Sequence, residues 1–199
     1  VHIGDGTGAN NFRLQLGGNV AGDPVQWLAR ATTNGTANTS TGYTANTWHH
    51  ACGVERSATD RSAFLNGGSE GTNATSRTPT GVDRLNVGSS LVAAGLWLQG
   101  RIAEVGIWNV ALSTPEVVAL SKGVNPQRIR RASLVAYYPL FGMGSPEPDY
   151  SSNKNHLTVT GTTLADHAPV QPPFGFDRGW MGAFTAAAAG RIWKLGGVG

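Results

Sequence analysis

The hydrophobic pattern changes its period between Gly100 and Leu120, and so predicts two different elements in succession. Residues 101–109 alternate well enough to form a strand that is packed on both faces. One face would carry Ala103, Val105 and Ile107, and the other would carry Ile102, Glu104 and Trp108. A strand of this kind belongs inside a sandwich of two sheets.

A short helix is predicted directly after this strand. Ser113 is a favourable N-cap residue, and Glu116 three positions later completes a capping box. Pro115 would lie in the first turn, where its missing N–H leaves no helical hydrogen bond unmade. Apolar residues follow on one side of the helix, and Gly123 would end it in the left-handed conformation.

Other segments supply the strands that a sandwich needs. Strands are predicted at residues 11–16, 25–31, 48–54, 62–65, 84–87, 134–140 and 157–159. Asn66-Gly67-Gly68 predicts a hairpin turn, residues 32–45 fit either a long loop or weakly patterned strands, and residues 70–81 are expected to be exposed. Strands about eight to fifteen residues apart, with Gly and Asn between them, are typical of an all-β sandwich or jelly roll.

The composition agrees with an all-β fold. Only 14% of the 199 residues are charged, 28 are Gly, and Ser, Thr and Asn are plentiful. The net charge of +3 is too small to indicate nucleic-acid binding, and no apolar run approaches the roughly 18–20 residues of a membrane span. Cys52 is the only cysteine, so no internal disulfide can form.

Two further expectations concern the ends of the chain. Because the sequence begins at Val1 rather than at Met, we expect a processed or truncated chain whose targeting cannot be read. Residues 169–199 are rich in Pro, Gly and Ala, and are expected to form an extended arm outside the core. The arm is predicted either to be disordered or to lay Trp180, Phe184 and Trp193 on a neighbouring subunit, since bare aromatic residues favour aggregation.

Four motifs resemble those of laminin-G-like jelly-roll domains, which belong to the concanavalin A-like lectin/glucanase group. They are N-T-W-H-H-A-C-G-V (46–54), F-L-N-G (64–67), L-N-V-G (85–88) and G-R-I-A-E-V-G-I-W-N-V-A-L-S-T-P-E-V (100–117). The resemblance covers about residues 10–122, and the motifs follow the family's order and spacing. It departs from the family at Ala103, where an Asp is usual. The resemblance implies a two-sheet antiparallel jelly roll with one short helix.

Residues 134–161 look like the opening stretch of such a domain. They would either close the same sandwich from its C-terminal side or begin a shortened second copy, and closure is favoured because few residues follow. We therefore predict one jelly-roll domain over residues 1–168, with incomplete N-terminal strands, and the arm at residues 169–199. The ending of the chain also resembles proteins from phages and environmental bacteria.

Calcium is the candidate cofactor that the resemblance implies, since many such domains bind it at the rim of the sandwich. Asp5, Asp23 and Asp83 are the candidate metal ligands, because they lie in predicted loops and offer carboxylate oxygens. A shared metal role for His49 and His50 is disfavoured, since adjacent residues of a strand point to opposite faces.

The sequence does not show the carboxylates that a glycosidase needs. The E-x-D-x-x-E strand pattern of the glucanases in this group is absent, and Glu147 and Asp149 lie in a Pro-rich loop. Glu104 is alone on its strand and is expected to be a hydrogen-bonded or Arg-paired structural residue. Cys52 is expected in the core, without a nucleophile–base arrangement around it. The chain is therefore predicted not to be an enzyme.

Aromatic side chains can stack on sugars, but Trp in a sandwich is more often part of the core. The resemblance places Trp48 and Trp108 in the core. Trp97, near a Gly-rich turn, is left as the candidate ligand-binding residue. The basic residues between Lys122 and Arg131 are predicted to form a solvated face.

These observations together predict a non-catalytic binding or structural module that is displayed on a surface. Its partners would be glycans or neighbouring protein subunits, as a lectin-like adhesion protein or as a virion decoration or fibre protein. We expect a homo-oligomer or a larger assembly, located outside the cell or on a virion surface. The alternative is a glycan-active hydrolase, or an accessory carbohydrate-binding module of one.

Overall fold

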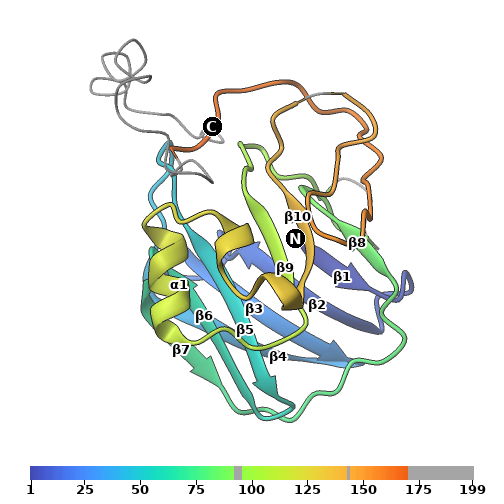
Figure 1. Ribbon diagram of the computed structural model, residues 1–199. Helices are drawn as coiled ribbons and strands as arrows, with labels where there is room; N and C mark the ends of the chain where they lie inside the picture. The colour runs from blue at the N-terminus through green and yellow to red at the C-terminus, as the bar shows by residue number, and fades with distance from the viewer. Residues whose placement is uncertain (92–95, 143, 170–199) are drawn as a thin grey trace. The chain divides into compact units, whose positions relative to one another are not determined.

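The computed structural model describes residues 1–91, 96–142 and 144–169 (Figure 1). The predicted subunit-contact residues Trp180, Phe184 and Trp193 lie outside the described residues. The chain divides into two units by its internal contacts. The first unit comprises Val1–Thr44, His49–Gln99 and Val110–Ser121, and the second comprises Ala45–Trp48, Gly100–Asn109 and Lys122–Gly199, described as far as Pro169.

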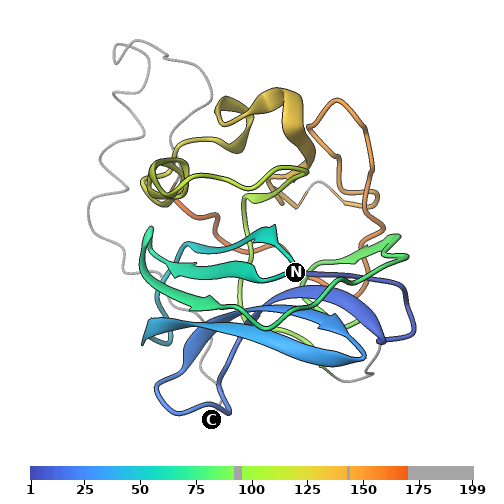
Figure 2. The same ribbon diagram turned by 90° about the horizontal axis from the view of Figure 1, so that it is seen from below.

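The first unit is a sandwich of two antiparallel sheets. The larger sheet has the strand order β4-β3-β2-β1-β8, and the smaller has the order β5-β6-β7. Their strands are β1 (His2–Gly4), β2 (Asn10–Leu16), β3 (Pro24–Ala31), β4 (Thr33–Gly42), β5 (Ala51–Ser57), β6 (Asp60–Leu65), β7 (Gly68–Asn73) and β8 (Arg84–Asn86). Figure 2 shows the two sheets as separate layers.

Apolar residues from both sheets fill the core of this sandwich. The buried residues are Val25, Leu28, Ala29 and Ala37 of the larger sheet and Val54, Ala63, Phe64 and Leu65 of the smaller. Burying one Val, Leu or Phe side chain contributes roughly 1.5–3 kcal/mol, so this cluster is a main source of the unit's stability. At the edge of the cluster the rings of Phe12 and Trp27 stack, with centroids 5.8 Å apart.

The structure resolves the ambiguous polar stretch 32–45 as the long edge strand β4. Its buried positions alternate, as a half-buried strand requires, but they are occupied by Gly35, Ala37 and Thr39. A side chain at Gly71 of β7 would collide with the backbone of Asn38. The two edge strands therefore approach closely because Gly71 has no Cβ. Residues 70–73 belong to β7, and none of them is buried, in agreement with the exposure that we predicted for residues 70–81.

Two local predictions are confirmed. Asn66 and Gly67 both have positive φ, 55° and 76°, as the predicted hairpin turn between β6 and β7 requires. The helix α1 (Thr114–Ser121) begins after Ser113, whose backbone N–H donates to the Glu116 carboxylate at 2.8 Å. Gly123 follows the helix with φ of 82°. No helix among the described residues combines the length and apolar character needed to span a membrane.

Two predicted strands have different bounds in the structure. The strand expected at 48–54 is shifted by three residues, to Ala51–Ser57. The strand expected at 101–109 is reduced to β9 (Val105–Trp108), because Glu104 has a φ of 58° and interrupts the extended backbone. The predicted alternation of side chains before Val105 is therefore wrong.

The second unit is built around β9 and β10 (Leu134–Tyr138), which pair antiparallel from Leu134 opposite Trp108 to Tyr138 opposite Val105. The 3-10 helices η1 (Pro126–Arg128) and η2 (Arg131–Ser133) lie between them in the sequence. The predicted strand at 157–159 is only a single bridge between Glu147 and Leu157. β10 pairs with the strand of the fourth motif in a separate two-stranded sheet, and both the closure of the sandwich and the domain boundary at residue 168 stay predictions.

Candidate ligand-binding groove

A groove of about 530 Å³ lies on the second unit, within the usual size range of small-ligand sites. Its walls come from η1, η2, the start of β10 and the loop after Pro148. The residues that line it are Gln127, Arg131, Ala132, Leu134, Tyr150, Ser151, Ser152 and Lys154. We call this feature the η-loop groove.

The loop 149–155 is fixed by the buried carboxylate of Asp149, which is 1% exposed. Its oxygens accept hydrogen bonds from the backbone N–H groups of Tyr137, Ser151 and Asn155 and from the Ser151 hydroxyl, at 2.8–2.9 Å. Burial alone would raise the pKa of Asp149, but these hydrogen bonds outweigh it and lower the pKa. The carboxylate therefore acts as a charged anchor for the loop.

Buried and exposed residues alternate at the start of this loop, from Asp149 to Ser152. Asp149 and Ser151 are buried, whereas Tyr150, Ser152 and Lys154 are exposed. The Ser151 hydroxyl also lies 3.0 Å from the carbonyl of Val135, so its single proton is shared between this carbonyl and Asp149, which ties the loop to β10. With Asp149 and Ser151 anchored in this way, the exposed residues Tyr150, Ser152 and Lys154 contribute to the groove lining.

The wall formed by η1 is joined to the same loop. Asn125 caps η1 by accepting from the backbone N–H of Gln127 at 2.9 Å, and its amide donates to the Tyr137 hydroxyl at 2.8 Å. The Gln127 side chain then donates to the carbonyl of Tyr150 at 2.8 Å. The Tyr150 ring is 39% exposed and packs edge-on against the Tyr137 ring, with centroids 6.3 Å apart. Both walls are thus held in place without a ligand.

Glu104 lies behind this wall in a second polar cluster. The Tyr137 hydroxyl donates to Glu104 at 2.7 Å, and Nε2 of His167 lies 3.3 Å from the other carboxylate oxygen and 2.8 Å from the carbonyl of Pro139. The Glu104 carboxylate raises the pKa of His167 in spite of the burial of the ring, and burial together with Glu104 raises the pKa of Tyr137. Glu104 is hydrogen-bonded as expected, but its ionic partner is a His rather than an Arg.

The structure does not gather the three candidate calcium ligands into one group: Asp5 and Asp83 flank the paired ends of β1 and β8, where the Asp83 N–H donates to the Gly4 carbonyl at 3.1 Å, whereas Asp23 lies in a different turn. Asp5 accepts five hydrogen bonds from the next residues of its own loop, donated by Thr7, Gly8 and Asn10. Burial would raise the pKa of Asp5, but these hydrogen bonds lower it. Asp23 lies in the turn at the opposite end of β2, and Asp83 is exposed with Arg84 at 3.5 Å.

A calcium role for these residues stays a prediction. The described residues contain no group of three or more His, Cys, Asp or Glu side chains that could hold a metal ion. His49 contacts Thr44 and Asn66 through its two ring nitrogens, which is a structural role. Burial lowers the pKa of His50 to about 4 and raises the pKa of Cys52 to about 12, so both side chains are neutral at pH 7.

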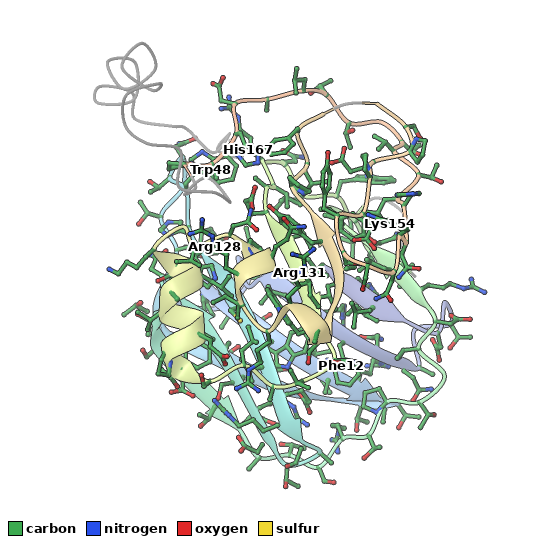
Figure 3. All side chains as sticks on the ribbon, in the orientation of Figure 1. Phe12, Trp48, Arg128, Arg131, Lys154 and His167 are labelled. Atoms are coloured by element: carbon green, nitrogen blue, oxygen red, sulfur yellow. The ribbon has the colours of Figure 1, made fainter. Side chains whose placement is uncertain are left out.

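The described tryptophans fall into two groups, half-buried and exposed. Trp27 and Trp108 are half-buried, and their indole N–H groups donate to Glu55 at 2.9 Å and to the carbonyl of Ile129 at 2.8 Å. Trp48 is also half-buried (Figure 3). Trp97 is 68% exposed, and its contact with a ligand stays a prediction.

Comparison with known proteins identifies the scaffold. A laminin-G family model, described as the concanavalin A-like lectin/glucanases superfamily, matches residues 1–118. The chain belongs to this superfamily. The all-β jelly-roll sandwich predicted from the four motifs is therefore confirmed. Searches of the curated proteins and of the solved structures found no match.

The η-loop groove lies beyond the residues that the family model matches. Sequence reasoning missed it, because it predicted a solvated face for the basic run and a plain loop for residues 145–155. One available signal was the alternation of Asp149 and Ser151 with Tyr150, Ser152 and Lys154. This alternation indicates a groove only when the hydrogen bonds to Asp149 are known, because they show that Asp149 and Ser151 are the buried residues.

Proposed function

We propose that this protein is a non-catalytic carbohydrate-binding module that is displayed outside the cell. The observation that carries the proposal is the η-loop groove, whose lining includes the exposed aromatic residue Tyr150 together with Gln127 and Ser152. Membership of a superfamily that includes lectins supports the same function.

The chemistry of this lining suits a sugar. A pyranose ring offers an apolar C–H face, which stacks on an aromatic ring, and a rim of hydroxyl groups, which pair with amide and hydroxyl side chains. The hydrogen bonds from Gln127 to Tyr150 and from the loop to Asp149 fix the groove beforehand. A fixed site loses little conformational entropy when the sugar binds, which favours affinity.

The carboxylates near the groove are engaged in structural contacts. Asp149 accepts four hydrogen bonds from its own loop and β10, Glu147 accepts from the backbone N–H of Leu140 at 3.1 Å, and Glu104 accepts from Tyr137. Glycoside hydrolysis requires one carboxylic acid and one carboxylate free to act on the substrate. This arrangement favours binding over hydrolysis.

The proposal is tested by measuring the dissociation constants for a panel of polysaccharides with wild type, Tyr150→Ala and Trp97→Ala. Loss of the stacking ring should weaken binding by about 1.5 kcal/mol, or roughly tenfold, in Tyr150→Ala. Trp97→Ala is the matched control, because it removes an exposed aromatic ring from the other unit. Binding that depends on Trp97 and not on Tyr150 would refute the groove. Hydrolysis of the panel that Glu104→Gln abolishes would establish the enzymatic alternative.

A structural module in a larger assembly is the second candidate function. It is favoured by the consecutive exposed residues Leu96, Trp97 and Leu98, which are 60%, 68% and 36% exposed. Under this proposal no polysaccharide binds, and the protein sediments as an oligomer that Trp97→Ser dissociates. A virion decoration or fibre protein would be one form of such a module.

A further inference from the structure

The charge of the η-loop groove points to a narrower ligand class. We propose that the groove binds an acidic sugar, one whose carboxylate or sulfate ester lies between Arg131 and Lys154. This inference rests on the proposed function and adds the chemistry that would select the ligand.

The two cations reach the groove from different segments, Arg131 from η2 and Lys154 from the loop 149–155 (Figure 3). Both are exposed, and neither is within ion-pair distance of a carboxylate of the described residues. Other cations of the same chain do pair, as Arg84 does with Asp83 and Arg101 with Asp166. The described lining of the groove contains no Asp or Glu. Two positively charged residues therefore line the same groove, and neither is paired with a carboxylate of the described residues.

The backbone conformation fixes the positions of Arg131 and Lys154. Lys154 has a φ of 58° and precedes Asn155, whose N–H is bound to Asp149 at 2.8 Å. Arg131 follows Arg130, which has a φ of 40° and caps η2. Left-handed backbone at two non-glycine residues beside one groove is maintained only where the surroundings fix it. The positions from which the two side chains extend are thus set before a ligand arrives.

These groups complement an acidic sugar better than a neutral one. A guanidinium can donate two parallel hydrogen bonds to a carboxylate or sulfate, and an ammonium adds a compact charge beside it. The Tyr150 ring would take the C–H face of the same sugar, with Gln127 and Ser152 at its hydroxyls. A neutral sugar would leave both cations without a partner in the groove.

Binding is measured by titration calorimetry at low salt with polygalacturonate, dextran sulfate, neutral dextran and single-stranded oligothymidylate as probes. The variants are Arg131→Gln and Lys154→Asn, the latter because Asn tolerates the left-handed backbone at this position. Arg84→Gln is the matched control, since it removes one exposed positive charge from the other unit. Lys154→Arg keeps the charge, and circular dichroism checks that every variant is folded.

We expect at least one of the two acidic polysaccharides to bind at least tenfold more tightly than dextran. Arg131→Gln and Lys154→Asn should each weaken that binding by about tenfold, the loss of one charge-assisted hydrogen bond, while Arg84→Gln and Lys154→Arg leave it unchanged. Preference for polygalacturonate would assign a carboxylate, and preference for dextran sulfate would assign a sulfate ester.

Three results would overturn the inference that the ligand is an acidic sugar without by themselves excluding a ligand-binding role for the groove. Equal affinity for dextran and the acidic polymers, still dependent on Tyr150, would mean a neutral-sugar site. Equal weakening by Arg84→Gln would mean diffuse attraction to the whole surface rather than a site. Tighter binding of oligothymidylate through the same two cations would assign the groove to nucleic acid. Failure of every polysaccharide to bind would overturn both proposals.

Discussion

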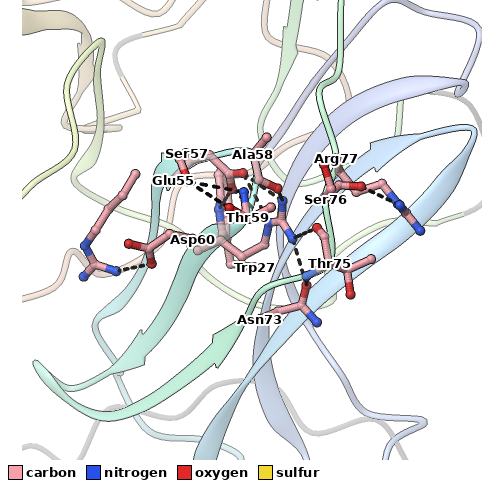
Figure 4. A network of polar contacts seen from close by, with 12 residues as sticks. Trp27, Glu55, Ser57, Ala58, Thr59, Asp60, Asn73, Thr75, Ser76 and Arg77 are labelled. Carbon is pink, nitrogen blue, oxygen red and sulfur yellow. Dashed lines mark hydrogen bonds and ion pairs between the residues drawn. The ribbon is translucent and has the colours of Figure 1, made fainter.

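Replacing Arg61 tests the polar network that the sandwich buries between its strands. The Arg61 side chain is 0% exposed and forms an ion pair with Glu55 at 3.0 Å. It also donates to Asn73 at 2.8 Å and to the carbonyls of Thr75 and Ala58 at 2.6 and 2.7 Å (Figure 4). One side chain thereby connects β5, β6 and the segment after β7.

The magnitude follows from what Arg61→Met leaves behind. Glu55 is only 21% exposed, and it would keep Trp27 as a donor but lose its charge partner. Removing one partner of a buried ion pair typically destabilises a protein by about 3–5 kcal/mol. We expect a loss of about 3 kcal/mol, since Glu55 retains some contact with water. That is a large share of the roughly 5–15 kcal/mol by which domains are stable.

Urea unfolding at pH 7, followed by tryptophan fluorescence, measures the change in the free energy of unfolding. Arg56→Met is the matched control, because Arg56 pairs with Asp60 at 3.2 Å on the surface, where the two side chains are 30% and 54% exposed. It should cost less than about 1 kcal/mol. The double variant Arg61→Met with Glu55→Met should regain part of the loss, since no unpaired charge remains. A loss below 1 kcal/mol for Arg61→Met alone would refute the reasoning.

Two further predictions concern the groove and the response to pH. Asp149→Ala leaves three backbone N–H groups without their acceptor, so urea unfolding should show a loss of about 3 kcal/mol. Asp166→Ala, at an exposed ion pair, should change stability by less than about 1 kcal/mol, and equal effects of the two variants would contradict this account of the loop. Burial lowers the pKa values of His2 and His50 to about 4, below the ordinary 6.5. Between these two pH values the unfolded chain therefore binds more protons than the folded chain. The free energy of unfolding should fall as the pH drops from about 6.5 to 4, and it should fall less steeply in His50→Gln. His167 has a raised pKa, so its effect on stability has the opposite pH dependence. Its contribution to stability is complete below pH 6.5 and is lost as the pH rises through its folded pKa. If stability falls equally on the alkaline side in wild type and His167→Gln, this reasoning is contradicted.

The elements that the sequence predicted well are those fixed by rules acting over a few residues. Ser113 and Glu116 lie within one helical turn, so the cap of α1 could be recognised from spacing alone. Asn66 and Gly67 tolerate positive φ, which is the single requirement of their turn. Neither prediction needed knowledge of what packs against the element.

The elements that were missed depend on neighbours distant in the sequence. The inward positions of β4 are Gly35, Ala37 and Thr39, which carry little hydrophobic signal, and a Cβ at Gly35 would lie only 2.6 Å from the Arg61 guanidinium. Glu104 was assigned to a strand from its alternation with Val105, whereas its contacts with Tyr137 and His167 hold it in a left-handed conformation. Tertiary contacts overrode the local pattern at both places.

The same reasoning explains why the scaffold could be identified from sequence and the candidate site could not. The motifs that mark the superfamily lie within residues 1–118, where packing restricts residue choice along successive strands. The groove takes Arg131 from a basic run and Lys154 from a polar loop, and each segment by itself looks like ordinary solvated surface. The exposure of these loop residues depends on Asp149, because its buried hydrogen bonds fix the backbone of the loop. If the proposed function holds, ligand choice is set by a loop outside the matched region, and relatives that share the sandwich while differing at positions 149–154 should differ in the sugars that they bind.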